Sequence, residues 1–72
     1  MKKYYIEFVY WLNSPNYCIQ SKWFKNKKSA INWYNKNFDF VDDAQIGVYL
    51  MCAEFNECDE IVGDIQQLYK IN

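Results

Sequence analysis

Apolar and polar residues alternate over residues 3–12, which is the pattern of a β-strand with two different faces. One face of this strand is wholly apolar, and the other includes Glu7. Residues 13–16 combine Asn, Ser and Pro, which favour a turn, and residues 17–24 predict a second strand. We expect Glu7 to lie opposite Lys22 in the resulting hairpin, because that register joins opposite charges and keeps one face almost wholly apolar.

A helical pattern follows over residues 27–37. Its apolar residues recur at the spacing of one helix face, and Asn26 precedes them as a suitable N-cap. Residues 39–43 form an acidic loop, and residues 44–54 alternate again, which predicts a third strand. These elements predict a β-β-α-β core in which the helix covers one face of a small antiparallel sheet.

The last segment is compatible with a helix or with a strand. As a helix over residues 57–70, it would have one apolar stripe, Asn56 as its cap, acids in its first turn and Lys70 in its last, an order that suits the helix dipole. As a strand over residues 64–71, it would close a β-β-α-β-β sheet, although its alternation is poor. Gly63 in mid-helix would cost about 1 kcal/mol. We favour the amphipathic helix, and either form gives an α+β fold.

Composition sets limits on this fold. Seventy-two residues make a single domain, residues 1–72, which buries only about 60% of its unfolded surface. Apolar residues make up 51% of the chain, so we expect some of them to form an exposed contact surface. A homodimer is the simplest interface of this kind. The aromatic residues expected on the sheet face opposite the first helix, unless a second helix covers them, are Tyr5, Trp11, Phe24 and Tyr49. Of these, the candidate aromatic contact residues for a partner are Trp11, Tyr5 and Tyr49.

Charge is sorted along the chain, beneath a formal net charge of −1. Residues 1–36 hold seven lysines and one acid, whereas residues 37–72 hold eight acids and one lysine. An acidic group can imitate the spacing of phosphates and meet the basic surface of a host protein that handles nucleic acid. The more ordinary interpretation is a solvated surface. The candidate acidic contact residues are Glu54, Glu57, Asp59, Glu60 and Asp64.

A basic group offers the alternative binding surface. Lysines interleaved with aromatic residues can follow a phosphate backbone and stack on bases. The absence of arginine and the negative total charge count against specific recognition, because arginine is the better reader of phosphate and guanine. Direct contact with nucleic acid is therefore predicted to be weak and salt-sensitive. The residues of this group are Lys22, Trp23, Lys25, Lys27 and Lys28.

No residue pattern predicts catalysis, a metal or a cofactor. The chain has no histidine to complete a zinc set or a Cys–His pair, and calcium-loop spacing is absent. Its cysteines, Cys18, Cys52 and Cys58, are odd in number and predict reduced thiols in a cytoplasmic protein. No apolar run approaches the ~18 residues of a membrane span, and the first residues do not form a signal peptide. We therefore expect a non-enzymatic protein in the bacterial cytoplasm.

Residues 23–34 join a strand end, a capped helix start and an aromatic-rich helix, from Trp23-Phe24-Lys25 through Ala30-Ile31-Asn32-Trp33-Tyr34. In this the chain resembles the small Lys-, Asn- and Tyr-rich β-β-α-β-type proteins encoded by phages and mobile elements of low-GC Gram-positive bacteria. Many such proteins bind a host protein, and some are anti-CRISPR or other anti-defence inhibitors. The resemblance and the acidic group together predict a phage-encoded module that masks a nucleic-acid-processing complex of the host.

Overall fold

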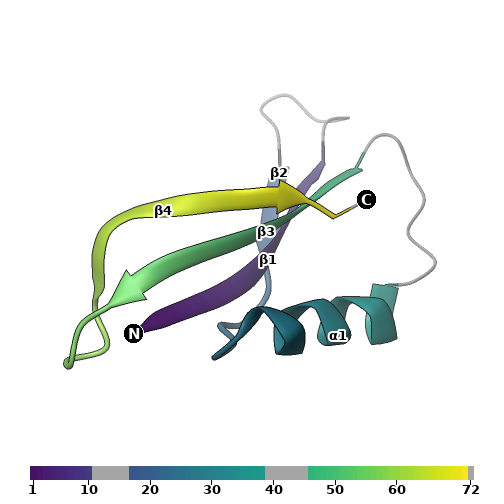
Figure 1. The fold of residues 1–72 in the computed structure, drawn as a ribbon. Coiled ribbons are helices and arrows are strands. Elements are labelled where there is room, and N and C mark those ends of the chain that lie inside the picture. The colour runs from purple at the N-terminus through teal and green to yellow at the C-terminus, as the bar shows by residue number, and fades with distance from the viewer. Residues whose placement is uncertain (11–16, 39–45, 72) are drawn as a thin grey trace.

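The computed structural model describes residues 1–10, 17–38 and 46–71. In these residues the strands form one antiparallel sheet with the order β2-β1-β3-β4, and the helix α1 lies against one of its faces (Figure 1). The predicted α+β class is therefore confirmed. The elements in chain order are β1 (Lys2–Tyr10), β2 (Tyr17–Gln20), α1 (Lys27–Phe38), β3 (Ile46–Phe55) and β4 (Ile61–Lys70).

β1 and β3 form the centre of the sheet and pair from Lys2 opposite Glu54 to Tyr10 opposite Ile46. Alternation sends every second side chain of each strand toward α1, where these side chains make the main core. Full burial of one such aliphatic side chain stabilises the fold by about 1.5–3 kcal/mol. The buried members of this core are Ile6, Phe8, Ala30, Tyr34, Val48 and Leu50.

The helix begins where the sequence predicts it. Asn26 Oδ1 accepts the backbone N–H of Ser29 at 2.8 Å, which confirms Asn26 as the N-cap. α1 runs to Phe38, one residue beyond the predicted end. The predicted acidic loop at 39–43 lies outside the described residues.

The hairpin of β1 and β2 has a different register from the predicted one. Glu7 lies opposite Gln20 and not opposite Lys22, so the pairing is shifted by two residues. A shift of two keeps every side chain on its predicted face, because side chains alternate with a period of two. Regular pairing ends after Gln20, where the hydroxyl of Ser21 accepts the Ile6 N–H at 2.8 Å.

Beyond this point the pairing shifts by one residue, and this exchanges the faces of the next two aromatic side chains. Ser21 N–H donates to the Ile6 carbonyl, but Phe24 pairs with Tyr4 through reciprocal backbone bonds of 2.8 and 2.6 Å. The segment from Ser21 to Phe24 therefore contains one residue more than the segment of β1 that it faces. Phe24 packs toward α1, with its ring centroid 5.8 Å from that of Trp33, so its predicted place on the outer face is wrong.

The C-terminal segment is the strand β4, so the favoured helix over 57–70 is wrong. β4 pairs antiparallel with β3 and starts earlier than the alternative strand over 64–71. Gly63 has a φ of 80°, which an α-helix does not contain, and it lies beside a shift in the β3–β4 register. A further shift occurs opposite Leu50 and Met51. The edge of β3 supplies backbone partners that the sequence of the segment alone does not reveal.

Candidate protein-binding surface

Asn56 organises the turn between β3 and β4. Its Oδ1 accepts the N–H groups of Cys58 at 2.9 Å and of Glu60 at 3.0 Å, and its own N–H donates to the Glu60 carbonyl at 3.0 Å. Asp59 adopts a left-handed φ of 63°, which Asp tolerates better than most residues. Asn56 is thus a turn former and not the cap of a helix. The same side chain suits both roles because each needs an oxygen that accepts backbone N–H groups.

Two cations at the start of the chain partly neutralise the acids of this hairpin. The N-terminal amine of Met1 lies 2.8 Å from Glu54 Oε1, and Lys3 Nζ lies 2.6 Å from Asp59 Oδ1. The hydrogen bond from the amine lowers the pKa of the Glu54 carboxyl below its ordinary value. Such exposed pairs add little stability. Glu54 and Asp59 nevertheless present less negative charge to a partner than the sequence suggested.

Three further acids carry the open negative charge of the hairpin. Glu57, Glu60 and Asp64 are exposed, and no salt bridge joins them to another residue in the described ranges. Lys2 and Asp64 line the same pocket. The structure therefore places all five predicted acids on one hairpin and leaves three of them open. We call Glu57, Glu60 and Asp64 the hairpin acids.

β4 is exposed along its whole length, which the sequence analysis missed. All ten of its residues are open to solvent, and its large apolar side chains have between 37% and 51% of their surface exposed. The predicted helix would have buried these side chains as one stripe. The β-branched residues among them were the available signal for a strand. The exposed apolar residues of β4 are Ile61, Val62, Ile65, Leu68 and Tyr69.

Tyr5 is buried, so its predicted role as an exposed contact residue is wrong. Its side chain is 2% exposed because Trp23 packs edge-on against it, with ring centroids 4.6 Å apart. Trp23 also packs edge-on against Phe55 at 4.9 Å, and Lys3 Nζ lies 4.7 Å from the centre of the Phe55 ring. Trp23 therefore covers part of the sheet face that α1 leaves open, and a second, smaller core forms there.

The other aromatic residues predicted to contact a partner differ from Tyr5 in their exposure. Tyr49 is half-buried on β3, and Trp11 lies outside the described residues. Tyr69 is 49% exposed on β4, and the sequence analysis did not name it among the candidate contact residues. Among the described aromatic side chains, the most open one therefore lies on β4.

The basic group lies where β2 leads into α1. Lys25, Lys27 and Lys28 are exposed, and the exposed Lys22 has its Nζ 5.4 Å from the centre of the Phe24 ring. Trp23 is half-buried in the second core, so its ring is poorly placed to stack on a base. The cations of this group are thus open to solvent, whereas its predicted stacking residue is engaged within the fold.

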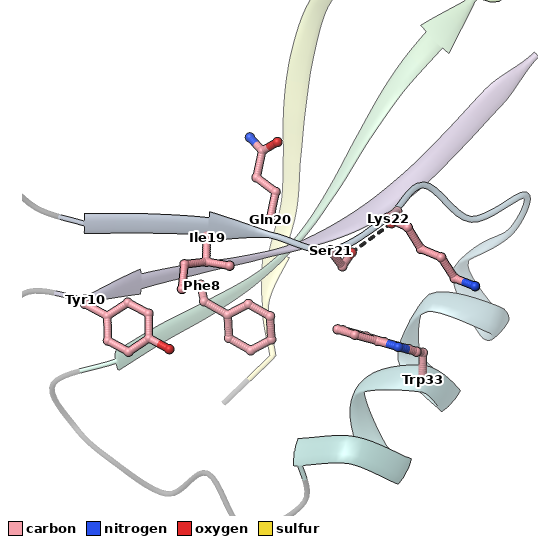
Figure 2. Close-up of a pocket in the computed structure, with 7 residues that line it drawn as sticks. All are labelled: Phe8, Tyr10, Ile19, Gln20, Ser21, Lys22 and Trp33. Carbon is pink, nitrogen blue, oxygen red and sulfur yellow. Dashed lines mark hydrogen bonds between the residues drawn. The ribbon is translucent and has the colours of Figure 1, made fainter.

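A cleft of about 580 Å³ lies between the sheet and α1 (Figure 2). Phe8, Ile19 and Trp33 supply apolar walls, and Lys22 contributes a cation. The Ser21 hydroxyl accepts the N–H of Ile6 and donates to the Lys22 carbonyl at 2.9 Å, so it is held by the backbone. Figure 2 shows the polar end of Gln20 directed away from the aromatic rings. The cleft combines apolar side chains with one ammonium group among the residues that line it.

The three cysteines are free thiols in the described ranges. Cys18 and Cys58 are exposed free thiols, and Cys52 is a buried one. No three His, Cys, Asp or Glu residues of the described chain are grouped as a metal site requires. In the same residues no helix is long and apolar enough to cross a membrane.

Comparisons of the chain with protein-family models, with curated proteins and with solved structures found no match. The function is therefore inferred from the residues and the geometry described above. The hairpin combines open negative charge with exposed apolar side chains, and it is the candidate site that these features favour.

Proposed function

We propose that this chain is a non-enzymatic protein-binding module, and that its β3–β4 hairpin contacts the partner. The observation that carries the proposal is the combination of the hairpin acids with the exposed apolar side chains of β4. Apolar and aromatic side chains supply most of the energy of a protein interface, whereas charges orient the approach. Both kinds of residue are present on this one element.

The partner that fits this surface carries positive charge around an apolar centre. Host proteins that handle nucleic acid hold phosphates with basic clefts, and a negatively charged hairpin is complementary to such a cleft. The resemblance to small proteins of phages and mobile elements, some of which are anti-defence inhibitors, agrees with this choice of partner. We therefore propose that the module masks or inhibits a nucleic-acid-handling protein of a bacterial host.

The first test is an affinity pull-down with tagged protein from the lysate of a low-GC Gram-positive bacterium, with and without nuclease. We expect a host protein that stays bound after nuclease treatment, is released by high salt, and is displaced by added duplex DNA. Displacement by DNA is the informative readout, because it shows that the module and nucleic acid share one surface on the partner. Recovery of nucleic acid without a host protein would contradict the proposal.

Two double variants assign the captured partner to one surface. Glu57→Lys with Glu60→Lys should weaken binding by about tenfold or more, because two attractive charges become repulsive. These positions are suitable because both side chains are exposed and form no described salt bridge. Glu54 and Asp59 are left unchanged, since each is paired with a cation of the same chain. Retained binding by this variant would exclude the hairpin as the contact surface.

The matched control reverses two exposed lysines, Lys27→Glu with Lys28→Glu, and should leave partner binding intact. It also tests the alternative function of a weak nucleic-acid-binding accessory protein. That alternative is supported by the exposure of Lys25, Lys27 and Lys28 at the start of α1. If this alternative is right, the protein should bind nucleic acid in a salt-dependent and nuclease-sensitive way, and only the lysine variant should lose that binding.

A further inference from the structure

We infer that the cleft between α1 and the strands β1 and β2 binds a small aromatic carboxylate, with the ring among the apolar walls and the carboxylate at Lys22. The cleft has a volume of about 580 Å³, which lies within the range of pockets that hold small molecules. It lies at the β2 edge of the sheet, whereas the hairpin acids belong to the hairpin at the β4 edge. Binding at this cleft is therefore independent of the proposed partner surface.

The walls of the cleft come from the sheet on one side and from the helix on the other. Phe8 and Tyr10 reach it from β1, Ile19 from β2 and Trp33 from α1 (Figure 2). The Phe8 and Trp33 rings meet edge to face, with their centroids 6.5 Å apart. Ile19 is a large apolar residue that is 42% exposed, so a ligand with an apolar body would remove its surface from water. Aromatic walls favour an aromatic ring as that body.

The charge at the cleft determines the sign of the ligand. Lys22 is the charged residue among the lining residues, and in the described ranges no salt bridge joins its ammonium to an acid. Its Nζ lies 5.4 Å from the centre of the Phe24 ring, and that ring packs against Trp33 with centroids 5.8 Å apart. The ammonium therefore lies at the edge of the same aromatic group. A carboxylate attached to a ring in the cleft would pair with this cation.

The other polar side chains of the cleft leave this role to Lys22. The Ser21 hydroxyl is engaged by the Ile6 N–H and by the Lys22 carbonyl, and the polar end of Gln20 is directed away from the rings (Figure 2). No acid is among the described residues that line the cleft. A cationic ligand would therefore meet repulsion from Lys22 with no opposite charge in the walls to offset it. An anion carries the complementary charge.

Three matched probes test the cleft, each titrated into isotope-labelled protein and followed by NMR. Phenylacetate should cause saturable shifts of the Ile19 and Gln20 amide signals and of the Trp33 indole N–H signal, while the signals of the β3–β4 hairpin stay in place. Phenethylammonium carries the same ring with the opposite charge, and it should bind about threefold or more weakly. Cyclohexylacetate keeps the charge but has a saturated ring, so it should also bind more weakly than phenylacetate.

Charge reversal at Lys22 separates a lost site from a lost fold. Lys22→Glu should reverse the preference, so that phenethylammonium binds about threefold or more tightly than phenylacetate. An unfolded chain cannot produce such a reversal. Lys25→Glu is the matched control, because Lys25 is exposed in the same segment but does not line the cleft, and it should keep the preference for phenylacetate.

Several results would overturn the assignment of this ligand. Shifts of the cleft signals that do not saturate would show that the cleft is not a binding site. Equal affinity for phenylacetate and phenethylammonium, or a preference that Lys22→Glu leaves unchanged, would exclude Lys22 as the group that selects the anion. Equal affinity for phenylacetate and cyclohexylacetate would exclude the aromatic ring as the feature that the walls select.

Discussion

At the scale of single residues, four acids of the hairpin differ in whether a cation of the same chain pairs with them. Glu54 and Asp59 are paired with the Met1 amine and with Lys3 at the start of β1. Glu57 and Glu60 have no such pair within the described chain and remain available to a partner. Residues of one chemical type thus differ in role because only some of them lie within reach of a cation.

Tyr5 should make the stability of the fold depend on pH in the alkaline range. Burial raises the pKa of its phenol above the ordinary value of 10.0, and nearby Glu7 raises it further. Well below the ordinary pKa of 10.0, the Tyr5 phenol is neutral in both the folded and the unfolded chain. As pH rises above 10.0, the phenol of the unfolded chain loses its proton more readily than the phenol of the folded chain. The free energy of unfolding should therefore fall as pH rises through the raised pKa of Tyr5.

Tyr5→Phe removes this titration, so its free energy of unfolding should fall less steeply between about pH 9 and about pH 11. Part of the fall should remain, because burial also raises the pKa of Tyr34. Urea unfolding followed by circular dichroism across this range provides the measurement. Identical pH profiles for the two proteins would show that the Tyr5 phenol is not shielded from solvent.

At the scale of elements, β4 shows how a neighbouring strand determines secondary structure. Its apolar residues fit a helical stripe, yet β3 offers a continuous edge of backbone donors and acceptors. A hairpin forms readily because Asn56 and Asp59 suit a tight turn. Gly63 then permits the left-handed backbone at which the register shifts.

Gly63→Ala should lower the free energy of unfolding by about 1–2 kcal/mol, through backbone strain alone. A Cβ atom at this position would meet no atom within 4 Å, so no steric clash contributes. Gly63→Asn should cost less, because asparagine tolerates a left-handed φ better than alanine does. Urea unfolding of the three proteins at one concentration is the measurement. Equal stability of the alanine variant and the unmodified protein would contradict the conformation described for Gly63.

At the scale of the whole molecule, stability depends on one thin core between the sheet and α1 and on the smaller cluster around Trp23. Domains of this size have little stability to lose. The core lies under β1 and β3, whereas β4 adds hydrogen bonds at the edge and little buried apolar surface. Side chains of equal chemistry should therefore differ greatly in their effect on folding.

Leu50 and Leu68 provide a matched pair for this expectation. Leu50 is completely buried, so Leu50→Ala should lower the free energy of unfolding by about 2–5 kcal/mol. Leu68 is 37% exposed on β4, and Leu68→Ala should cost less than about 1 kcal/mol in dilute solution. Urea unfolding compares the two variants. Similar losses would indicate that the C-terminal segment packs into the core, as the predicted helix would have done.

The candidate site was predicted in part. The acids of the hairpin were identified because they are close together in the sequence, and any fold keeps Glu57 near Glu60. The exposed side chains of β4 were missed, because their exposure depends on the strand state of that segment. The burial of Tyr5 was missed as well, since one extra residue near Ser21 decides on which face Trp23 lies.

The sequence by itself determined the features whose causes are local. Alternation specified β1 and β3, and helical spacing with Asn26 specified α1, because each signal lies within the element that it describes. Tertiary structure alone decided the register of β2, the strand state of β4 and the partners of Glu54 and Asp59. Those outcomes depend on backbone and charged groups that lie far away in the sequence, and only the folded chain brings them within bonding distance.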